Sequence, residues 1–156
     1  FAVVEGLFFS SLFATVFYFR QGGKVPGLCQ GNELIMKDEQ SHYEFAVNYY
    51  NRYCEKISKE EIKDIILSAY EVEKIFVEEL LEKGLPGLTK ELMLQFVQFT
   101  TDGLLNDFGI DKEFNVSQPL DFMNKIALKT RSNFFERKSG EYTKLKQSDR
   151  LFDEDF

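Results

Sequence analysis

The sequence predicts an all-α bundle of helices, and three features support this fold class. Apolar residues recur at spacings of three and four over long stretches, which is the period of one helix face. Glycine and proline separate these stretches, as at Gly22-Gly23 and Pro26-Gly27. Hydrophobic residues make up 44% of the 156 residues, enough for a packed core. We expect a partial helical domain over residues 1–128 and a flexible tail over residues 129–156.

The overall charge and the apolar segments exclude several classes of protein. A formal charge of -7 argues against nucleic-acid binding, which needs a basic surface. The uncharged run from Gly6 to Phe19 is shorter than the roughly 20 residues of a membrane span, so no membrane contact is expected. Cys29 and Cys54 lack zinc-site or redox-motif spacing and indicate free thiols in a reducing, cytoplasmic compartment. Because the chain starts at Phe1 inside a helical pattern, we expect a fragment of a longer protein.

Local signals set the ends of the expected helices. Ser58 followed by Glu61 is a capping box, and Thr89 is a further N-cap. The Asp102-Gly103 pair indicates a kink, a close backbone approach or a tolerated glycine. A stripe on the third helix is expected to serve packing only; it consists of Ile62, Ile65, Ile66, Ala69, Val72 and Phe76. The expected helices cover residues 1–20, 28–54, 58–83, 89–109 and 119–126.

The first helix is apolar on every side, so we expect it to be central. In the second helix the spacing places Glu39 and His42 on the buried face and leaves Glu33 and Glu44 in solvent. The predicted inner stripe consists of Leu28, Gly31, Ile35, Glu39, His42, Ala46 and Tyr49.

Two features point to a metal site. Glu39 and His42, the only histidine, lie three residues apart, so their side chains meet over one spot of a helix. An oxygen and an imidazole nitrogen there suit iron, manganese or zinc. Alone, this Glu-x-x-His pattern is common by chance. Glu5 strengthens it, because an unpaired carboxylate in an apolar helix must be neutral, paired or metal-bound. Together they supply half of a ferritin-like di-iron carboxylate site.

Four stretches in order resemble the small subunit of class I ribonucleotide reductase, most closely its eukaryotic and viral branch. Residues 1–10 are similar to the family's F-x-x-x-E-G-I-F-F-S helix, and residues 32–42 to its N-E-L-I-x-R-D-E-x-x-H helix. Residues 133–142 resemble N-F-F-E…G-E-Y, and residues 152–156 resemble the D-A-D-F terminus that binds the large subunit. The resemblance implies a ferritin-like di-iron carboxylate bundle, of which this chain is the C-terminal half.

The resemblance also implies roles for individual residues. Glu5, Glu39 and His42 would be ligands of the di-iron centre. Asp38 is similar to the aspartate that supports an iron-bound histidine on the radical path. A pocket that shields the family's tyrosyl radical would include Phe9, Phe13 and Ile35. Tyr142 matches the tyrosine that relays the radical, and the docking peptide would comprise Phe152, Asp153, Glu154, Asp155 and Phe156.

Two departures from the family qualify these expectations. Lys37 stands where the family usually has arginine, so the charge survives without the bidentate fork. The family takes one carboxylate, a second Glu-x-x-His, the radical tyrosine and a tryptophan from upstream helices, and no such set exists here. We therefore expect the isolated chain neither to assemble the cofactor nor to form the radical.

The resemblance predicts the radical-generating subunit of ribonucleoside-diphosphate reductase, a homodimer docked to large subunits, with iron or manganese as the metal. It would supply deoxyribonucleotides for DNA synthesis. Two alternatives remain. Another di-iron carboxylate oxidase of the same fold would share the ligands but have no use for Tyr142 or the Phe156 terminus. A metal-free helical interaction module would make the pairing of Glu39 with His42 incidental.

Overall fold

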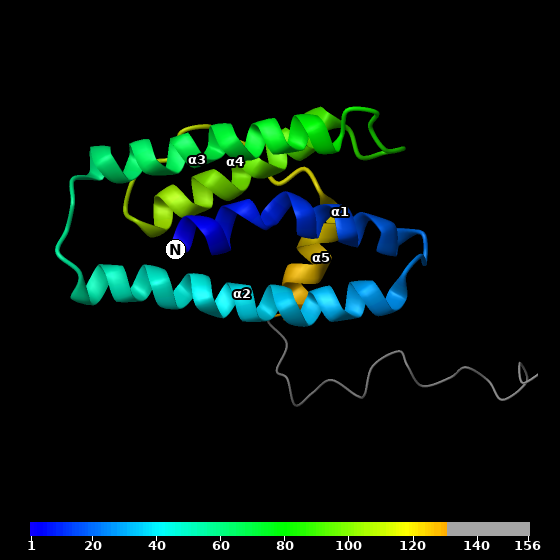
Figure 1. Ribbon diagram of the computed structural model, residues 1–156, viewed down its shortest axis with the longest axis horizontal. Coiled ribbons are helices and arrows are strands. Elements are labelled where there is room, and N and C mark those ends of the chain that lie inside the picture. The colour runs from blue at the N-terminus through cyan, green and yellow to red at the C-terminus, as the bar shows by residue number, and fades with distance from the viewer. Residues whose placement is uncertain (131–156) are drawn as a thin grey trace, which may run out of the picture.

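Residues 1–130 are described by the computed structural model, and they fold into helices without any named strand (Figure 1). A short π-helical segment, η1, comes first and is followed by five α-helices. Their bounds are η1 Val4–Phe8, α1 Ser10–Gln21, α2 Pro26–Tyr53, α3 Lys59–Leu80, α4 Lys90–Asp107 and α5 Asp121–Thr130. Residues 131–156, which include most of the expected tail, lie outside this description.

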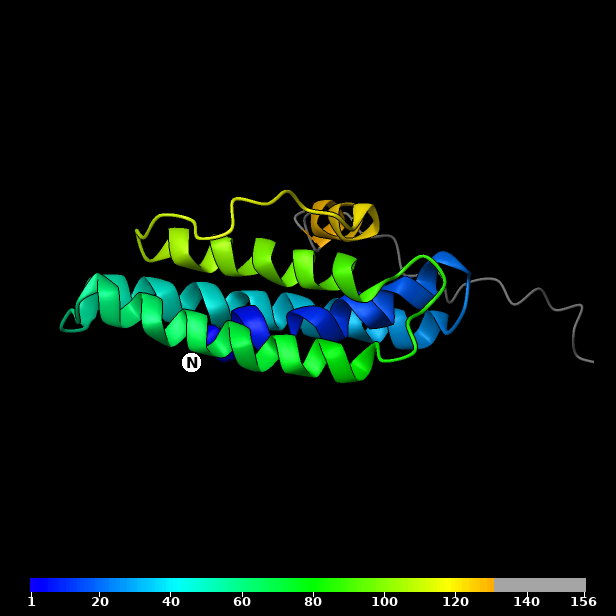
Figure 2. The same cartoon turned by 90° about the horizontal axis from the view of Figure 1, so that it is seen from above.

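The first helical stretch is central, as its sequence predicts. Together η1 and α1 contact each of the other four helices. In Figure 1, η1 and α1 run between α2 on one side and the pair of α3 and α4 on the other. Seen from above in Figure 2, α4 and α5 both lie on the same side of η1 and α1. Leu7, Ala14 and Phe17 are fully buried. A helix that is apolar all round is thus covered on several sides.

Helix starts follow the predicted capping signals. The Ser58 hydroxyl accepts a hydrogen bond from the backbone N–H of Glu61, and the Glu61 carboxylate accepts one from the backbone N–H of Ser58. The Thr89 hydroxyl caps α4 by accepting from the N–H of Leu92. These bonds satisfy backbone donors that have no partner within the helix.

The buried face of α2 differs from the predicted stripe by one residue. Cys29, Glu33 and Val47 are buried, and Met36 and Tyr43 pack against the core. Each of these except Glu33 follows a predicted stripe residue directly, a rotation of about 100° on a helix. The predicted inner residues Leu28, Ile35 and Tyr49 are instead exposed by 55%, 48% and 50%.

The prediction that Glu33 is solvated was wrong. Its side chain is buried and pairs with Arg20 of α1. The error has a physical cause. Because α2 carries apolar residues on two neighbouring faces, the spacing of these residues does not determine which face packs against η1 and α1 in this chain. Glu44, by contrast, is exposed as predicted.

The buried face of α3 was also only partly predicted. Ile66 and Ala69 are buried as expected, whereas Ile65, Val72 and Phe76 are exposed. The remaining buried positions of α3 are Tyr70, Glu73 and Val77. The Ser11 hydroxyl of α1 donates a hydrogen bond to the buried Glu73 carboxylate. Thus α3 carries a buried ionisable group, in contrast to the expectation of packing alone.

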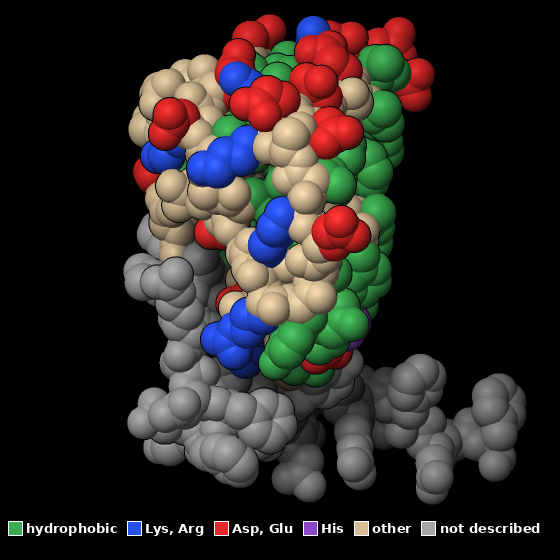
Figure 3. Space-filling view, turned by 90° about the vertical axis from the view of Figure 1, so that its left-hand side faces the viewer, with side chains coloured by type: hydrophobic (Ala, Val, Ile, Leu, Met, Phe, Trp, Pro, Cys, Tyr) green, Lys and Arg blue, Asp and Glu red, His purple; other side chains and the backbone are tan. Residues whose placement is uncertain are grey.

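One face of the described chain exposes many hydrophobic side chains. In Figure 3 they form a continuous green edge that runs from α3 to α2, with the histidine beside it. An apolar cavity of about 370 Å³ opens where the start of the chain meets the end of α2 and the start of α3. Its lining includes Phe1, Phe45, Tyr49, Ile65 and Phe108. Within residues 1–130, no helix has the length and apolar character needed to cross a membrane.

Candidate metal centre

Glu5 lies on a π-helical turn within the first helical stretch. The sequence predicts one continuous helix over residues 1–20, but the structure has the π-helix Val4–Phe8, a turn at Phe9, and only then α1. Such π-turns inside helices occur frequently at functional sites, because the extra residue per turn changes where side chains point. The backbone hydrogen-bond pattern thus departs from that of an α-helix at Glu5, which the sequence predicts to be a metal ligand.

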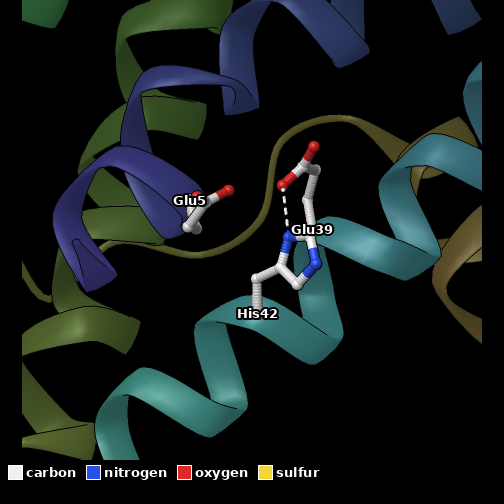
Figure 4. A group of neighbouring side chains, drawn as sticks. All are labelled: Glu5, Glu39 and His42. Carbon is white, nitrogen blue, oxygen red and sulfur yellow. Dashed lines mark hydrogen bonds and ion pairs between the residues drawn. The ribbon is translucent and has the colours of Figure 1, made fainter.

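Glu5 converges with Glu39 and His42, which come from α2 (Figure 4). One potential ligand atom from each residue lies within 4.8 Å of the other two. Glu39 and His42 also interact directly, with 3.1 Å between Oε2 and Nδ1. The predicted three-residue group therefore forms in space, from two elements that are distant in the sequence.

The two carboxyl groups influence each other's protonation. Hydrogen bonding with Glu39, together with burial, raises the pKa of Glu5. The same hydrogen bond and that of His42 lower the pKa of Glu39. Two carboxylates this close repel each other, so a proton is favoured on one of them. Glu39, whose pKa is lowered, is the partner that favours the ionised form, and an ionised carboxylate only accepts a hydrogen bond from a neighbouring ring N–H.

Burial differs among the three residues. Glu5 Oε2 is buried and has no hydrogen-bond partner within the described part of the chain. The side chain of Glu39 is 21% exposed and that of His42 is 54% exposed. The prediction that His42 lies on the buried face was therefore wrong for this chain. The buried face of α2 is rotated by one residue relative to the predicted face. His42 therefore lies on the exposed face of α2, which we call the open face, together with Ile35 and Tyr49.

This donor set fits a transition-metal ion. Two carboxylates and one imidazole suit iron, manganese or zinc. A cation between them would satisfy the buried Glu5 Oε2 and would remove the repulsion that now favours a proton. Three residues are fewer than a di-iron site takes from its helices, so a complete centre needs further ligands.

The other predicted site residues lie in several places. Asp38 is exposed on α2. Phe9 and Phe13 are partly buried, and their rings meet edge to face with centroids 6.4 Å apart. Ile35 lies on the open face of α2. Tyr142 and the docking peptide of residues 152–156 lie outside the described residues.

The sequence did not predict one contact beside the metal group, by which we mean Glu5, Glu39 and His42. The ring of Tyr43, the residue after His42, lies directly against Gly6, the residue after Glu5. The Tyr43 hydroxyl donates a 2.5 Å hydrogen bond to Oδ2 of Asp107 at the end of α4. Burial and this bond raise the pKa of Tyr43, so the phenol stays protonated. The one sequence feature that points to this contact is a glycine directly after Glu5 in a helix of bulky residues.

Comparison with known proteins identifies one family. Residues 1–119 match the family model described as ribonucleotide reductase, small chain. The chain is 42% identical over 145 residues to ribonucleoside-diphosphate reductase subunit M2 of Danio rerio, covering 93% of this chain and 38% of that protein. It is 41% identical to the ribonucleoside-diphosphate reductase small chain of Trypanosoma brucei brucei, covering 92% and 43%. The chain thus spans about two fifths of the relatives it matches.

A solved structure supports the same fold. The Rnr4 homodimer of ribonucleotide reductase from Saccharomyces cerevisiae aligns with a TM-score of 0.70 at 25% identity. The alignment covers 84% of this chain and 43% of that one. The prediction of an all-α, ferritin-like bundle is thereby confirmed.

Proposed function

Because the chain belongs to the ribonucleotide reductase small-chain family, we propose that it is part of the radical-generating small subunit of a ribonucleoside-diphosphate reductase. The observation that carries this proposal is the convergence of Glu5 with Glu39 and His42 within 4.8 Å. In such a subunit the bound metal pair supplies the oxidising chemistry that creates a tyrosyl radical, which the large subunit uses to reduce ribonucleotides. The metal is iron, with manganese as the alternative.

Each of the three residues has a distinct part in holding the metal. Glu5 brings a carboxyl oxygen from the central helical stretch, and this buried oxygen has no other partner among residues 1–130. Glu39 supplies the carboxylate whose pKa is lowered, and its contact with Nδ1 orients the His42 ring before a metal binds. A metal binds the ionised forms of carboxylates, so binding would displace the proton that the Glu5–Glu39 pair favours.

The remaining ligands would come from other parts of a longer subunit. The open face of α2 that carries His42 also exposes Phe45 and Tyr49, and the apolar cavity adjoins it. Further helices packed on this face would exclude water from the metal group and bring more carboxylates and a second histidine toward it. We propose accordingly that the isolated chain holds at most part of the centre.

The ligand assignment is tested by metal binding to ligand variants. We expect the chain to bind Co²⁺, a spectroscopic substitute for iron, and His42→Ala and Glu39→Ala each to weaken this binding by about tenfold or more. Glu44→Ala is the matched control, because Glu44 is exposed on the same helix. If both ligand variants bind Co²⁺ as tightly as the control, the assignment is wrong and the metal-free interaction module becomes the better explanation.

The partners are proposed from the family and from the tail. We propose a homodimer, as in the solved relative, which docks to a large subunit through residues 152–156. Tyr142 would relay the radical across that interface, and Asp38 would support the path within the small subunit. Phe9, Phe13 and Ile35 would line the radical pocket in the longer protein.

Deleting residues 151–156 from the complete subunit distinguishes the reductase subunit from the alternative, another di-iron carboxylate oxidase of the same fold. The reductase subunit should lose binding to the large subunit while keeping its metal content and radical signal. An oxidase without a large-subunit partner would show no binding to lose.

A further inference from the structure

We propose that Gly6 and Tyr43 act as a spacer that sets the distance between η1 and α2 and thereby holds Glu5 opposite Glu39 and His42. Gly6 directly follows Glu5, and Tyr43 directly follows His42. The spacer is therefore one residue from the metal group on both elements. The inference rests on the proposed function, in which these three residues bind a metal, and it assigns a positioning role to two residues that are not ligands.

The contact at Gly6 leaves no room for a side chain. A Cβ atom at this position would lie 2.7 Å from both Cδ2 and Cε2 of the Tyr43 ring. Such a distance is well inside van der Waals contact, so either the ring or the π-turn would have to move. By comparison, a Cβ at Gly31 of α2 would meet no described atom within 4 Å. Gly6 thus allows an approach of η1 to α2 that a larger residue would prevent.

The Tyr43 ring is held where it is, so it cannot simply swing aside. Its hydroxyl donates to Asp107 Oδ2, and Asp107 sits at the last residue of α4. The backbone carbonyl of Asp107 in turn accepts a hydrogen bond from Nδ2 of Asn51, about two turns further along α2. The ring is anchored at its base by α2 and at its tip by α4, and Gly6 lies against its edge.

A small displacement here would matter for metal binding. Metal–ligand bonds tolerate deviations of only about 0.2 Å, whereas relief of the Gly6→Ala overlap needs a larger shift. Residues that orient ligands without touching the metal typically change metal affinity by about 10- to 100-fold when mutated. A shift of η1 would move Glu5 while leaving Glu39 and His42 in place, because the latter two share one helix.

The experiment uses two readouts on the 156-residue chain. The first is Co²⁺ affinity from visible absorption, and the second is the metal-free nuclear Overhauser effect between the His42 ring and the Glu5 side chain. His42 is the only histidine, so its ring gives one assignable set of signals. Gly6→Ala should weaken Co²⁺ binding by about tenfold and reduce the Overhauser effect. Tyr43→Phe, which frees the ring tip, should weaken binding by about threefold.

Matched controls separate positioning from general destabilisation. Gly31→Ala makes the same chemical change on α2, where the added Cβ meets none of the described atoms within 4 Å, and Tyr49→Phe removes an exposed hydroxyl from the same helix. Both should keep the parent affinity and the parent Overhauser effect. In a Tyr43→Leu background, where the ring is gone, Gly6→Ala should cause a smaller further loss than it does in the parent.

The outcomes distinguish the spacer from the ligand assignment. The spacer is refuted if Gly6→Ala and Tyr43→Phe match their controls in the Overhauser effect. A parent chain that binds no Co²⁺ contradicts the ligand assignment, and the metal-free Overhauser effect still tests the spacer. If circular dichroism shows that Gly6→Ala is unfolded, Tyr43→Phe is compared with Tyr49→Phe instead. A weaker Overhauser effect in Tyr43→Phe alone supports the spacer, and equal effects in the two variants refute it.

Discussion

Arg20, in the last turn of α1, pairs with Glu33 in the second turn of α2, across the connection formed by residues 22–25. Glu33 is 6% exposed, so its carboxylate is almost wholly removed from water. A cation near a helix C-terminus is favourable, and Arg20 occupies that position. The pair thus fastens the central helix to the helix that carries Glu39 and His42.

Removing the carboxylate should destabilise the chain. Glu33→Ala leaves the Arg20 guanidinium partly buried without its partner, and we expect the free energy of unfolding to fall by about 2 kcal/mol. The roughly 3–5 kcal/mol of a fully buried pair is not expected, because the Arg20 side chain is 26% exposed. Chemical denaturation followed by circular dichroism measures the change. Glu44→Ala, on the exposed face of α2, should change stability by less than about 0.5 kcal/mol; an equal effect would contradict the role of the pair.

Glu73 should make stability depend on pH. Burial raises the pKa of Glu73 above its ordinary value of 4.5, although hydrogen bonds from Ser11 oppose the rise. The folded chain therefore holds this proton more tightly than the unfolded chain. Its effect on stability is absent below about 4.5 and becomes an increasing cost as the pH rises through the native pKa.

The Glu73→Gln variant measures this effect directly. Glutamine keeps an acceptor for the Ser11 hydroxyl but does not titrate. The stability of the variant relative to the parent should increase from about pH 4 toward neutral pH, as followed by urea unfolding at several pH values. Glu79→Gln, exposed on the same helix, should show no such trend. A difference between variant and parent that is independent of pH would contradict a raised native pKa.

Ser58 should stabilise α3 through its capping box. Ser58→Ala removes the oxygen that accepts from the Glu61 N–H, and we expect a loss of about 1 kcal/mol. The hydrogen bonds from Ser58 lower the pKa of Glu61. Their contribution is therefore present above the ordinary carboxyl pKa and disappears as the pH falls through the lowered native value. A thermal melt at neutral pH tests the substitution, with Ser68→Ala as the exposed control. Equal melting temperatures for the two variants would refute the cap.

Features that depend on neighbours in the sequence were predicted well. The helix starts at Ser58 and Thr89 follow from side chains that bond the backbone three residues on. The central position of the first stretch follows from an apolar surface on every side. Glu39 and His42 share a helix, so their approach is fixed by helix geometry.

Features that depend on tertiary rotation were not predicted. The one-residue offset of the α2 face reversed the environments expected for Glu33 and Ile35, because both faces of α2 carry apolar residues. The π-turn at Glu5 leaves no local sequence signal comparable to a cap. The buried bond between Ser11 and Glu73 joins residues 62 positions apart, and periodicity within one helix does not report such a pairing.

Asp102 should anchor the loop between α4 and α5. Its buried carboxylate accepts hydrogen bonds from three successive backbone N–H groups, those of Glu113, Phe114 and Asn115, at 2.7–2.9 Å. The loop then leads to Leu120 and Met123, which are buried in the core. The sequence suggests a kink or close approach at this position, but a Cβ on Gly103 would meet no described atom within 4 Å. The aspartate rather than the glycine is the structural residue of the pair.

Two substitutions at Asp102 should therefore differ in a defined way. Asp102→Ala leaves three N–H groups without an acceptor, and we expect a loss of about 3 kcal/mol. Asp102→Asn keeps the oxygen that serves Glu113 and Phe114 but turns an amide N–H₂ toward the N–H of Asn115, so its loss should be smaller, about 1–2 kcal/mol. Denaturant unfolding gives both values, and amide hydrogen exchange at Glu113 and Phe114 should accelerate only in the alanine variant. Asp111→Asn, exposed in the same loop, is the control. Equal losses for the alanine and asparagine variants would mean that the Oδ1 bonds contribute nothing, and the loop would then have to be held by the packing of Leu120 and Met123 instead.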